Sequence, residues 1–369
     1  MRTRASVVTA LGAGFTIEEL EVDEPIGREV LIEVKASGLC HSDLHAATTG
    51  LGVPFPAVLG HEVAGIVLAV GPETTGIVPG QHVVASLVQF CGECAACRTD
   101  RTFQCTDPAA TVRRPDQPPR LRRPDGTAVV SAFGTGGFAG LTLAHENQVV
   151  PVPDDLPFPV AAILGCATIT GAGAAIHSAD VRVGDSVAVI GLGGVGLNVI
   201  SGARLAGATT IVAIDAQEEK LALARRFGAT HVVHADGEQD VVAAVHQLTG
   251  GGVDHAFEVI GLAATTQDAI RMTRVGGDTN LIGIHRPGST IAVDPGDLLI
   301  SQRTIRGIYM GSSNIKADIP RYARLYQQGR LNLDDLIARE IALDDVADAY
   351  EELRTGTTAR SVITDFAAR

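Results

Sequence analysis

Hydrophobic and polar residues follow different patterns in the two parts of the chain. Up to about residue 150, short runs rich in β-branched residues are separated by glycine and proline, as at 30–35, 62–70 and 82–88. Several short strands with such turns predict a folded, barrel-like β domain. The first ten residues begin basic and turn apolar. Glycines at 12 and 14 interrupt this run too early for a signal peptide, so we expect a first strand there.

From about residue 168, continuous apolar runs alternate with helix-like stretches, which predicts a parallel sheet covered on both faces. The strand-like runs are 186–190, 211–215, 231–233, 253–260 and 279–284, and the helix-like stretches are 197–206, 218–227, 319–328 and 346–355. A last strand near 361–364 is expected to return to the first domain. We therefore predict a catalytic domain from residues 1–167 and 311–369, and a dinucleotide-binding domain from residues 168–310.

The length of 369 residues suggests two domains, and a hydrophobic content of 46% supplies enough apolar material for two cores. A formal net charge of −13 makes nucleic acid and anionic membranes poor partners. The uncharged run 186–203 has the length of a membrane span but contains five glycines, and a glycine-rich turn explains it better. With no targeting or spanning segment, the expected location is the cytoplasm.

Residues 107–126 form an unusual segment with five arginines separated by prolines. A nucleic-acid-binding patch is one interpretation of this segment. Because no aromatic residues are interleaved for base stacking, a solvated, exposed loop is the preferred interpretation.

A glycine motif lies between the first two strands of the predicted parallel sheet. Gly191, Gly193 and Gly196 match G-x-G-x-x-G, a strand precedes them, a helix follows, and Asp215 ends the next strand. Gly191 permits the tight turn, Gly193 lets the backbone approach a pyrophosphate, and Gly196 allows close helix packing. Asp215 can accept hydrogen bonds from ribose hydroxyls and would repel a 2′-phosphate, so NAD is expected over NADP. The alternative is a doubly wound domain that binds nothing there.

The six cysteines form two groups, and in a reducing compartment metal binding is favoured over disulfides. The closely spaced group can close a tetrahedron around a structural zinc ion; its members are Cys91, Cys94, Cys97 and Cys105. Cys40 and Cys166, with His61 between them, can form a three-ligand zinc site with one open position, as in catalytic sites. The alternatives are disulfides or free thiols in the first group and inert core thiols at Cys40 and Cys166.

These motifs together resemble the zinc-containing medium-chain alcohol dehydrogenases, in their long-loop form, over essentially the whole chain. The resemblance implies a GroES-like β-barrel catalytic domain joined to a Rossmann doubly wound parallel sheet. It also implies catalytic zinc on Cys40, His61 and Cys166, structural zinc on the other four cysteines, and NAD as the cofactor. The long-loop enzymes are usually dimers, so a homodimer is expected, with a tetramer as the alternative and the stretch 300–310 as the candidate edge.

The resemblance also implies roles for individual residues. Asp43 would orient His61, Glu62 could approach the metal, and Ser42 and His45 would relay the proton. The predicted cofactor contacts are His41, Thr170, Val195, Lys220 and Arg360. The predicted lining of an apolar pocket is Leu51, Leu87, Phe133, Ile284 and Met310. Alternatively, Ser42 is a turn or cap residue, His45 a structural histidine and Lys220 a solvated helix residue.

The implied reaction is reversible oxidation of a primary alcohol, aromatic or medium-chain, to an aldehyde. Two related alternatives are a dehydrogenase that acts on the thiol adduct of formaldehyde and an enzyme that keeps its NAD permanently bound. A more remote alternative is a non-catalytic protein that binds NAD or zinc. Small-molecule alcohols and aldehydes are the expected partners.

Overall fold

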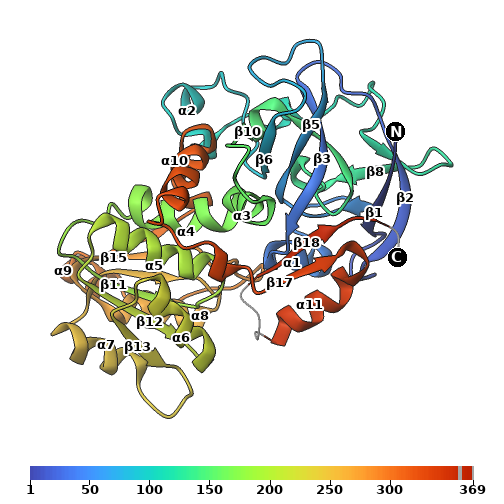
Figure 1. Cartoon of the computed structure of the whole chain (residues 1–369). Helices are drawn as coiled ribbons and strands as arrows, with labels where there is room; N and C mark the ends of the chain where they lie inside the picture. Colours follow the sequence, from blue (N-terminus) through green and yellow to red (C-terminus); the bar gives the residue numbers. More distant parts are fainter. Residues whose placement is uncertain (356–359, 368–369) are drawn as a thin grey trace. The chain divides into compact units, whose positions relative to one another are not determined.

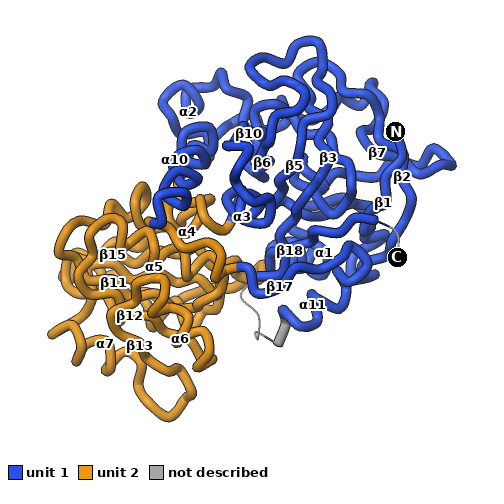
Figure 2. The backbone as a smooth tube through the Cα atoms, in the orientation of Figure 1, with its two compact units in different colours: residues 1–166, 313–329, 337–369 blue, residues 167–312, 330–336 orange. Residues whose placement is uncertain are grey.

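The computed structural model describes the backbone of residues 1–355 and 360–367, which divide into two compact units (Figures 1 and 2). Unit 1 comprises residues 1–166, 313–329 and 337–369, and unit 2 comprises residues 167–312 and 330–336. The segment 330–336 was predicted with the first domain but belongs to unit 2, where Arg330 O accepts a hydrogen bond from Arg204 and Asp335 pairs with Arg226. Hydrophobic periodicity gave no signal for so short an excursion of the chain.

Unit 1 is a β domain with a closed barrel of strands in the order β1-β2-β7-β8-β4 and a seven-stranded sheet. The sheet has the order β10-β6-β5-β3-β18-β17, with β9 also paired to β3. The strands are β1 (Arg2–Val8), β2 (Thr16–Val22), β3 (Glu29–Gly38), β4 (Ala57–Val58), β5 (Glu62–Val70), β6 (His82–Ser86), β7 (Leu121–Arg122), β8 (Ala128–Ser131), β9 (Leu141–His145), β10 (Val149–Pro151), β17 (Arg339–Ala342) and β18 (Ser361–Asp365). The helices are α1 (His41–Thr49), α2 (Ala95–Arg98), α3 (Phe158–Ile163), α10 (Ile315–Gln327) and α11 (Val346–Thr355).

The predicted β-type runs of the first part are strands, and the N-terminal run is β1. The C-terminal strand returns to this unit as expected, because Val362 and Ile363 of β18 pair antiparallel with Gly38 and Ser37 of β3. This pairing places Arg360 beside the end of β3, where the first cysteine of the candidate metal site follows.

Unit 2 contains a six-stranded, wholly parallel sheet in the order β13-β12-β11-β14-β15-β16. Numbered within the unit, this order is 3-2-1-4-5-6, the doubly wound order of dinucleotide-binding domains. The strands are β11 (Ser186–Ile190), β12 (Thr210–Asp215), β13 (His231–His234), β14 (Val253–Glu258), β15 (Thr273–Leu281) and β16 (Thr304–Gly307). The helices are α4 (Ile169–Gly173), α5 (Gly194–Ala206), α6 (Glu218–Phe227), α7 (Val241–Thr249), α8 (Ala263–Met272) and α9 (Pro295–Ser301). The uncharged run 186–203 is therefore a strand, a turn and a helix.

One continuous helical segment, 158–178, is long and apolar enough to cross a membrane by composition alone. It is made of α3 and α4, with π-helical turns at Leu164–Thr168 and Ala174–Ser178. Because 89% of its most apolar window is buried inside the protein, it has the character of a core helix. The first π-helical turn contains Cys166, and such turns often occur at functional sites.

Candidate active site and metal sites

The structure brings Cys40, His61 and Cys166 together inside unit 1. All three side chains are buried, and their ligand atoms lie within 4.8 Å of one another. Strand pairing explains the meeting of the first two, since Gly38 at the end of β3 is registered with Glu62 at the start of β5. Two thiols and one imidazole in this arrangement leave one position of a tetrahedron open, which is the donor set of a catalytic zinc site.

The orientation of His61 is fixed by Asp43. Asp43 Oδ1 lies 3.0 Å from His61 Nδ1 and also accepts a hydrogen bond of 2.9 Å from the backbone N–H of Gly60, and both side chains are buried. A proton on Nδ1 leaves the lone pair on Nε2, for which the described residues supply no hydrogen-bond partner. A buried imidazole nitrogen held in this way is suited to a metal ion, with a carboxylate on the opposite ring nitrogen.

The groups around Cys40 favour its thiolate form. The hydrogen bond from the Cys166 thiol is the main cause that lowers the pKa of Cys40, and the nearby Arg360 guanidinium adds to it. A thiolate is the metal-binding form of cysteine, so the site is prepared for a cation.

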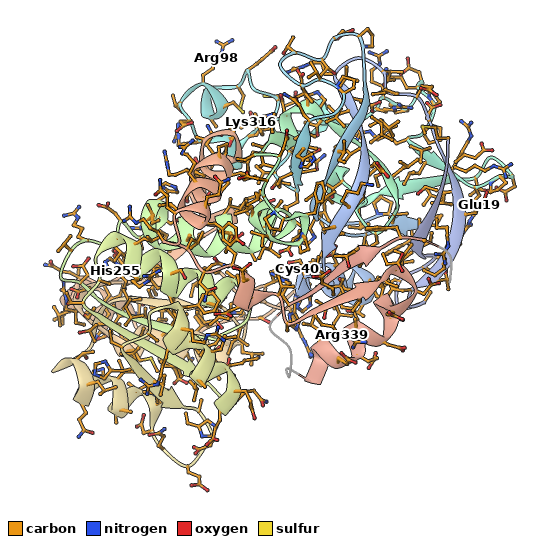
Figure 3. The ribbon with its side chains drawn as sticks, in the orientation of Figure 1. Glu19, Cys40, Arg98, His255, Lys316 and Arg339 are labelled. Carbon is orange, nitrogen blue, oxygen red and sulfur yellow. The ribbon has the colours of Figure 1, made fainter. Side chains whose placement is uncertain are left out.

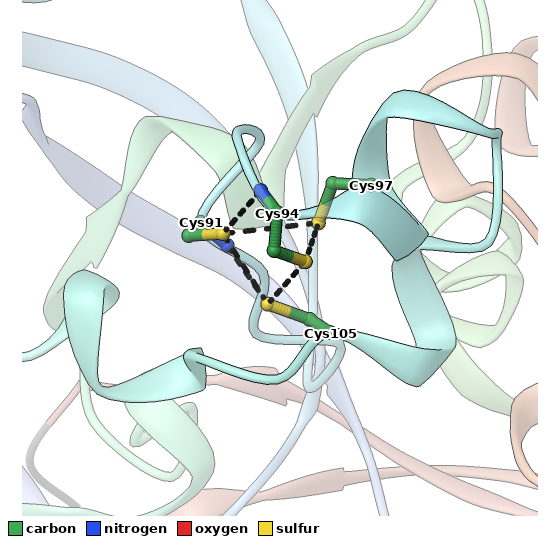
Figure 4. A group of neighbouring side chains, drawn as sticks. All are labelled: Cys91, Cys94, Cys97 and Cys105. Carbon is green, nitrogen blue, oxygen red and sulfur yellow. Dashed lines mark hydrogen bonds between the residues drawn. The ribbon is translucent and has the colours of Figure 1, made fainter.

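The four remaining cysteines form a second cluster on the loop around α2 (Figure 4). Four of their Sγ–Sγ distances are 3.5 Å (Cys94–Cys97), 3.6 Å (Cys91–Cys105), 3.9 Å (Cys91–Cys97) and 3.9 Å (Cys94–Cys105). A regular tetrahedron with zinc–sulfur bonds of about 2.3 Å has edges of about 3.8 Å. Backbone N–H groups of Glu93 and Cys94 also donate to Cys91 Sγ. The cluster therefore fits a closed, structural zinc site.

The glycine motif forms the turn between β11 and α5. Gly191 has φ +97, a conformation that favours glycine, and a Cβ at Gly196 would collide with the carbonyl oxygen of Gly191. By contrast, a Cβ at Gly193 would meet no atom within 4 Å, so its backbone faces open space at the N-terminus of α5. This arrangement can receive a phosphate group.

Asp215 has an additional structural role that the sequence did not indicate. Its Oδ2 accepts a hydrogen bond of 2.8 Å from Leu192 N, inside the glycine turn, while Lys220 Nζ lies 4.0 Å from the same oxygen. The carboxylate therefore holds the turn as well as marking the end of β12. Val195 lies in the first turn of α5, and Thr170 Oγ1 contacts Met310 Sδ at 3.6 Å within unit 2.

The remaining predicted site residues are distributed as follows. In unit 1, Ser42 and His45 are half-buried on α1, and His41 at the start of this helix is exposed. Of the predicted pocket residues, Leu51 is 38% exposed and Leu87 follows β6. The rings of Phe133 and His61 form an edge contact with their centroids 5.4 Å apart. Met310 and the 40% exposed Ile284 belong to unit 2. The pocket that would unite residues of both units remains a prediction.

Arg360 is buried in unit 1, where its Nη2 pairs with Glu62 and its Nη1 donates to Leu39 O. The sequence predicted a contact with the cofactor pyrophosphate for this arginine, and that contact remains a prediction. Burial raises the pKa of Glu62 to about 7, although Arg360 opposes the shift. The pair adjoins two candidate metal ligands, since Leu39 precedes Cys40 and Glu62 follows His61.

The arginine-rich segment 107–126 is largely exposed, as its composition predicted, but its arginine side chains are not free in solvent. Arg120 is buried, the side chain of the half-buried Arg113 is 7% exposed, and both bind the carboxylate of Glu29, whose side chain is also buried. The other three arginines pair too: Arg114 with Asp116, Arg122 with Glu21, and Arg123 with Glu18. The sequence gave no signal for four of these pairings, because the carboxylates of Glu18, Glu21 and Glu29 lie far back in the chain. All five guanidinium groups are neutralised within unit 1.

Fold and site together define a two-domain, zinc-dependent dehydrogenase. The chain matches the family model "Alcohol dehydrogenase GroES-like domain" over residues 27–154 and the model "Zinc-binding dehydrogenase" over residues 194–328. It is 38% identical to an NDMA-dependent alcohol dehydrogenase of Amycolatopsis methanolica, over 98% of this chain and 99% of that protein. It is 35% identical to an S-(hydroxymethyl)glutathione dehydrogenase of Paracoccus denitrificans, over 98% of this chain and all of that protein.

A solved structure of a relative also matches this chain over nearly its whole length. The benzyl alcohol dehydrogenase of Acinetobacter calcoaceticus matches with a TM-score of 0.93 and 35% identity, over 99% of both chains. The chain therefore belongs to the zinc-containing medium-chain alcohol dehydrogenase family.

Proposed function

We propose that this enzyme reversibly oxidises a primary alcohol, aromatic or medium-chain, to the aldehyde with NAD. The observation that carries the proposal is the buried set of Cys40, His61 and Cys166, in which Asp43 leaves His61 Nε2 available. The glycine turn with Asp215 supports NAD. The half-buried Phe133 beside His61 and the similarity to a benzyl alcohol dehydrogenase support an apolar, aromatic substrate.

The residues of the chain divide the chemical tasks. When bound, zinc supplies a Lewis acid for the hydroxyl oxygen, and NAD supplies the acceptor for the hydride. Cys40, His61 and Cys166 hold the metal, while Asp43 keeps the proton of His61 on Nδ1. Gly193 and the N-terminus of α5 receive the pyrophosphate, and Asp215 receives the ribose hydroxyls.

Proton release is assigned to α1. Ser42 and His45 are three positions apart, so their side chains lie on one face of the helix. Both are half-buried, whereas His41 at the start of the helix is exposed. We assign to Ser42 the hydrogen bond to the alcohol hydroxyl and to His45 the transfer of the proton to solvent.

The paired arginines weigh against a thiol-adduct substrate. An adduct of a glutathione-type thiol carries carboxylates that need cationic partners. In the segment 107–126, which is fully described, every arginine already pairs with a carboxylate of unit 1. An ordinary alcohol is therefore the preferred substrate, although one relative is named for the glutathione adduct.

We further propose a cytoplasmic homodimer. Strand β16 is at the edge of the sheet of unit 2, and on the neighbouring α9 the side chains of Leu299 and Ile300 are 77% and 81% exposed. An open sheet edge beside exposed apolar side chains suits pairing with a second copy. A tetramer is the alternative assembly.

The test is NADH formation after zinc-loaded protein is mixed with NAD and benzyl alcohol. A steady rise in NADH absorbance is expected, and the Cys40→Ser variant should lose it while its circular dichroism is preserved. Activity that requires added glutathione would favour the thiol-adduct enzyme. NADH that co-purifies with the protein and exchanges only through a second substrate would favour a permanently bound cofactor. Unchanged activity in Cys40→Ser would refute the zinc mechanism.

A further inference from the structure

One buried amide lies behind two of the predicted pocket residues. Gln148 precedes β10 and is fully buried. Its Nε2 donates hydrogen bonds of 2.9 Å to Phe133 O and 2.9 Å to Ser86 O. Ser86 directly precedes Leu87, so a single NH₂ group holds the backbone at both Phe133 and Leu87.

The Phe133 end of this bridge is a turn that needs support. Phe133 has φ +55, an uncommon conformation for a bulky side chain. The following Gly134 has φ +75, and a Cβ there would come within 2.5 Å of Gln148 Oε1. The turn therefore fits closely against Gln148, and it places the Phe133 ring next to the ring of His61, with an angle of 79° between the ring planes.

The Ser86 end reaches the metal site by a second route. Ser86 is fully buried, and its Oγ donates a hydrogen bond of 2.7 Å to Gly165 O, the carbonyl that precedes Cys166. Ser86 is also registered opposite Glu62, the neighbour of His61, in the β5–β6 pair. The bridge from Gln148 thus ends beside two of the three candidate metal ligands.

The two hydrogen bonds that Gln148 Nε2 donates explain why this amide is buried. Among the described residues, Gln148 Oε1 has no hydrogen-bond partner. Burying a polar atom without a hydrogen-bond partner costs free energy, and the two hydrogen bonds from Nε2 must offset that cost. An apolar residue of similar size would fill the same space but would release both carbonyls.

We propose that Gln148 is a positioning residue that fixes Phe133 and Leu87 as pocket walls and thereby sets the preference between bulky and small primary alcohols. This inference rests on the proposed function for its substrate. The geometric part of the inference is independent of the proposed function, because the position of the Phe133 ring can be measured without catalysis.

The first experiment compares Gln148→Met with wild type on benzyl alcohol and ethanol. Methionine keeps the length of the side chain but donates no hydrogen bond. The ratio of kcat/KM for benzyl alcohol to that for ethanol is expected to change by about tenfold, the scale of discrimination in apolar pockets. Zinc content should stay the same. The matched control is Gln89→Met, because Gln89 also lies beside Gly134 but donates to Thr111 Oγ1 and not to Phe133. That control should leave the ratio unchanged.

The second experiment places 4-fluorophenylalanine at position 133 and records its ¹⁹F NMR signal. Gln148→Met should shift or broaden the signal, and Gln89→Met should not. If Gln148→Met does not fold, Gln148→Asn serves, because its amide is one methylene too short to reach both carbonyls. A signal that is the same in wild type and in the Gln148 variant overturns the proposal. If the wild type oxidises no alcohol while the signal shifts, the proposed function fails and the positioning role stands.

Discussion

Arg360 Nη2 lies 3.1 Å from Glu62 Oε1, and both side chains are buried. Arg360 Nη1 also donates a hydrogen bond of 2.6 Å to Leu39 O. One guanidinium therefore joins the backbone before Cys40 to the carboxylate after His61. It connects the surroundings of two candidate metal ligands from a position that precedes β18 and is distant in sequence.

Replacing Arg360 with methionine should destabilise the protein, because it leaves Glu62 buried beside the metal site without its cation. Breaking a buried ion pair from one side costs about 3–5 kcal/mol, so the free energy of unfolding in urea should fall by about this amount. Arg360→Lys, which keeps one positive charge but cannot reach both partners, should lose less. Weaker binding of NAD without loss of stability would show instead that Arg360 acts only on the cofactor.

Glu29 should be a second stabilising centre, since it binds both Arg113 and Arg120. Burial raises its pKa, but hydrogen bonds from Arg113 and the charge of Arg120 dominate and hold that pKa below its usual value. Glu29→Gln leaves the buried Arg120 without its anion and leaves Arg113 with Asp23 alone, so a loss of about 3–5 kcal/mol is expected from urea unfolding. The exposed pair Arg114–Asp116 in the same segment is the control, and Asp116→Asn should leave the free energy of unfolding nearly unchanged. Equal effects of the two substitutions would contradict the assignment.

His145 should make the stability of the protein depend on pH. Burial lowers the pKa of His145 from an ordinary value of 6.5 to about 4, and the positive charges of Arg28 and Arg120 add to this shift. Between these values the unfolded chain binds a proton that the folded chain does not, so stability rises with pH across this window and falls as pH drops from 6.5 to 4. The whole effect is at most about 3 kcal/mol.

The measurement is urea unfolding at several pH values for wild type and His145→Asn, with zinc content determined at each pH. Asparagine can still accept the hydrogen bond that His145 Nδ1 receives from Asn147 N. The variant should lose less stability than wild type over the window. Parallel curves for the two proteins would mean that His145 is not the titrating group.

The cofactor preference should depend on the charge of Asp215. Asp215→Asn keeps an oxygen that can accept from Leu192 N but removes the repulsion of a 2′-phosphate. The ratio of kcat/KM for NADP to that for NAD should rise by about tenfold or more. Asp215→Ala should in addition weaken binding of NAD, because the glycine turn loses its hydrogen bond. If the ratio is unchanged in both variants, another residue sets the preference.

The parts of the protein that could be predicted from the sequence are those encoded by local patterns. The strand, glycine turn and helix from 186 to 206 and the four-cysteine loop each lie within one short segment, so spacing alone defines them. The metal-binding trio was accessible because cysteine and histidine have few other reasons to occur in such motifs. Its partner Asp43 was accessible only through resemblance to a family.

Contacts between distant segments could not be predicted in this way. The sequence pattern indicated solvated charges at Arg113 and Arg120, because their partner Glu29 lies more than eighty positions away in the sequence. Gln148 and Ser86 gave no signal at all, since a buried amide or hydroxyl has no characteristic spacing. Tertiary packing determines the contacts of such residues, and the periodicity of the sequence carries no information about that packing.

The four-cysteine loop should hold the start of α10 as well as its metal. Asp100, in this loop, accepts a hydrogen bond from Asn314 Nδ2 at the N-terminus of α10. Lys316, labelled in Figure 3, donates to the carbonyl oxygens of Glu146 (2.6 Å) and Val149 (2.5 Å). Cys105→Ser should reduce bound zinc from two ions per chain to one, because a structural site needs all four ligands.

With the loop released, the first turn of α10 would lose the hydrogen bond between Asn314 and Asp100 and keep those of Lys316. Amide hydrogen exchange in residues 314–320 should then accelerate by about tenfold or more, while exchange in the parallel sheet of unit 2 stays unchanged. Arg98→Ala, at an exposed position on the same loop, is the control and should leave zinc content and exchange as in wild type. Asp100→Ala should accelerate exchange in α10 without loss of zinc, because it cuts the connection and spares the ligands. If Cys105→Ser loses its zinc while exchange in α10 remains slow, the loop does not support this helix and the metal stabilises only its own surroundings.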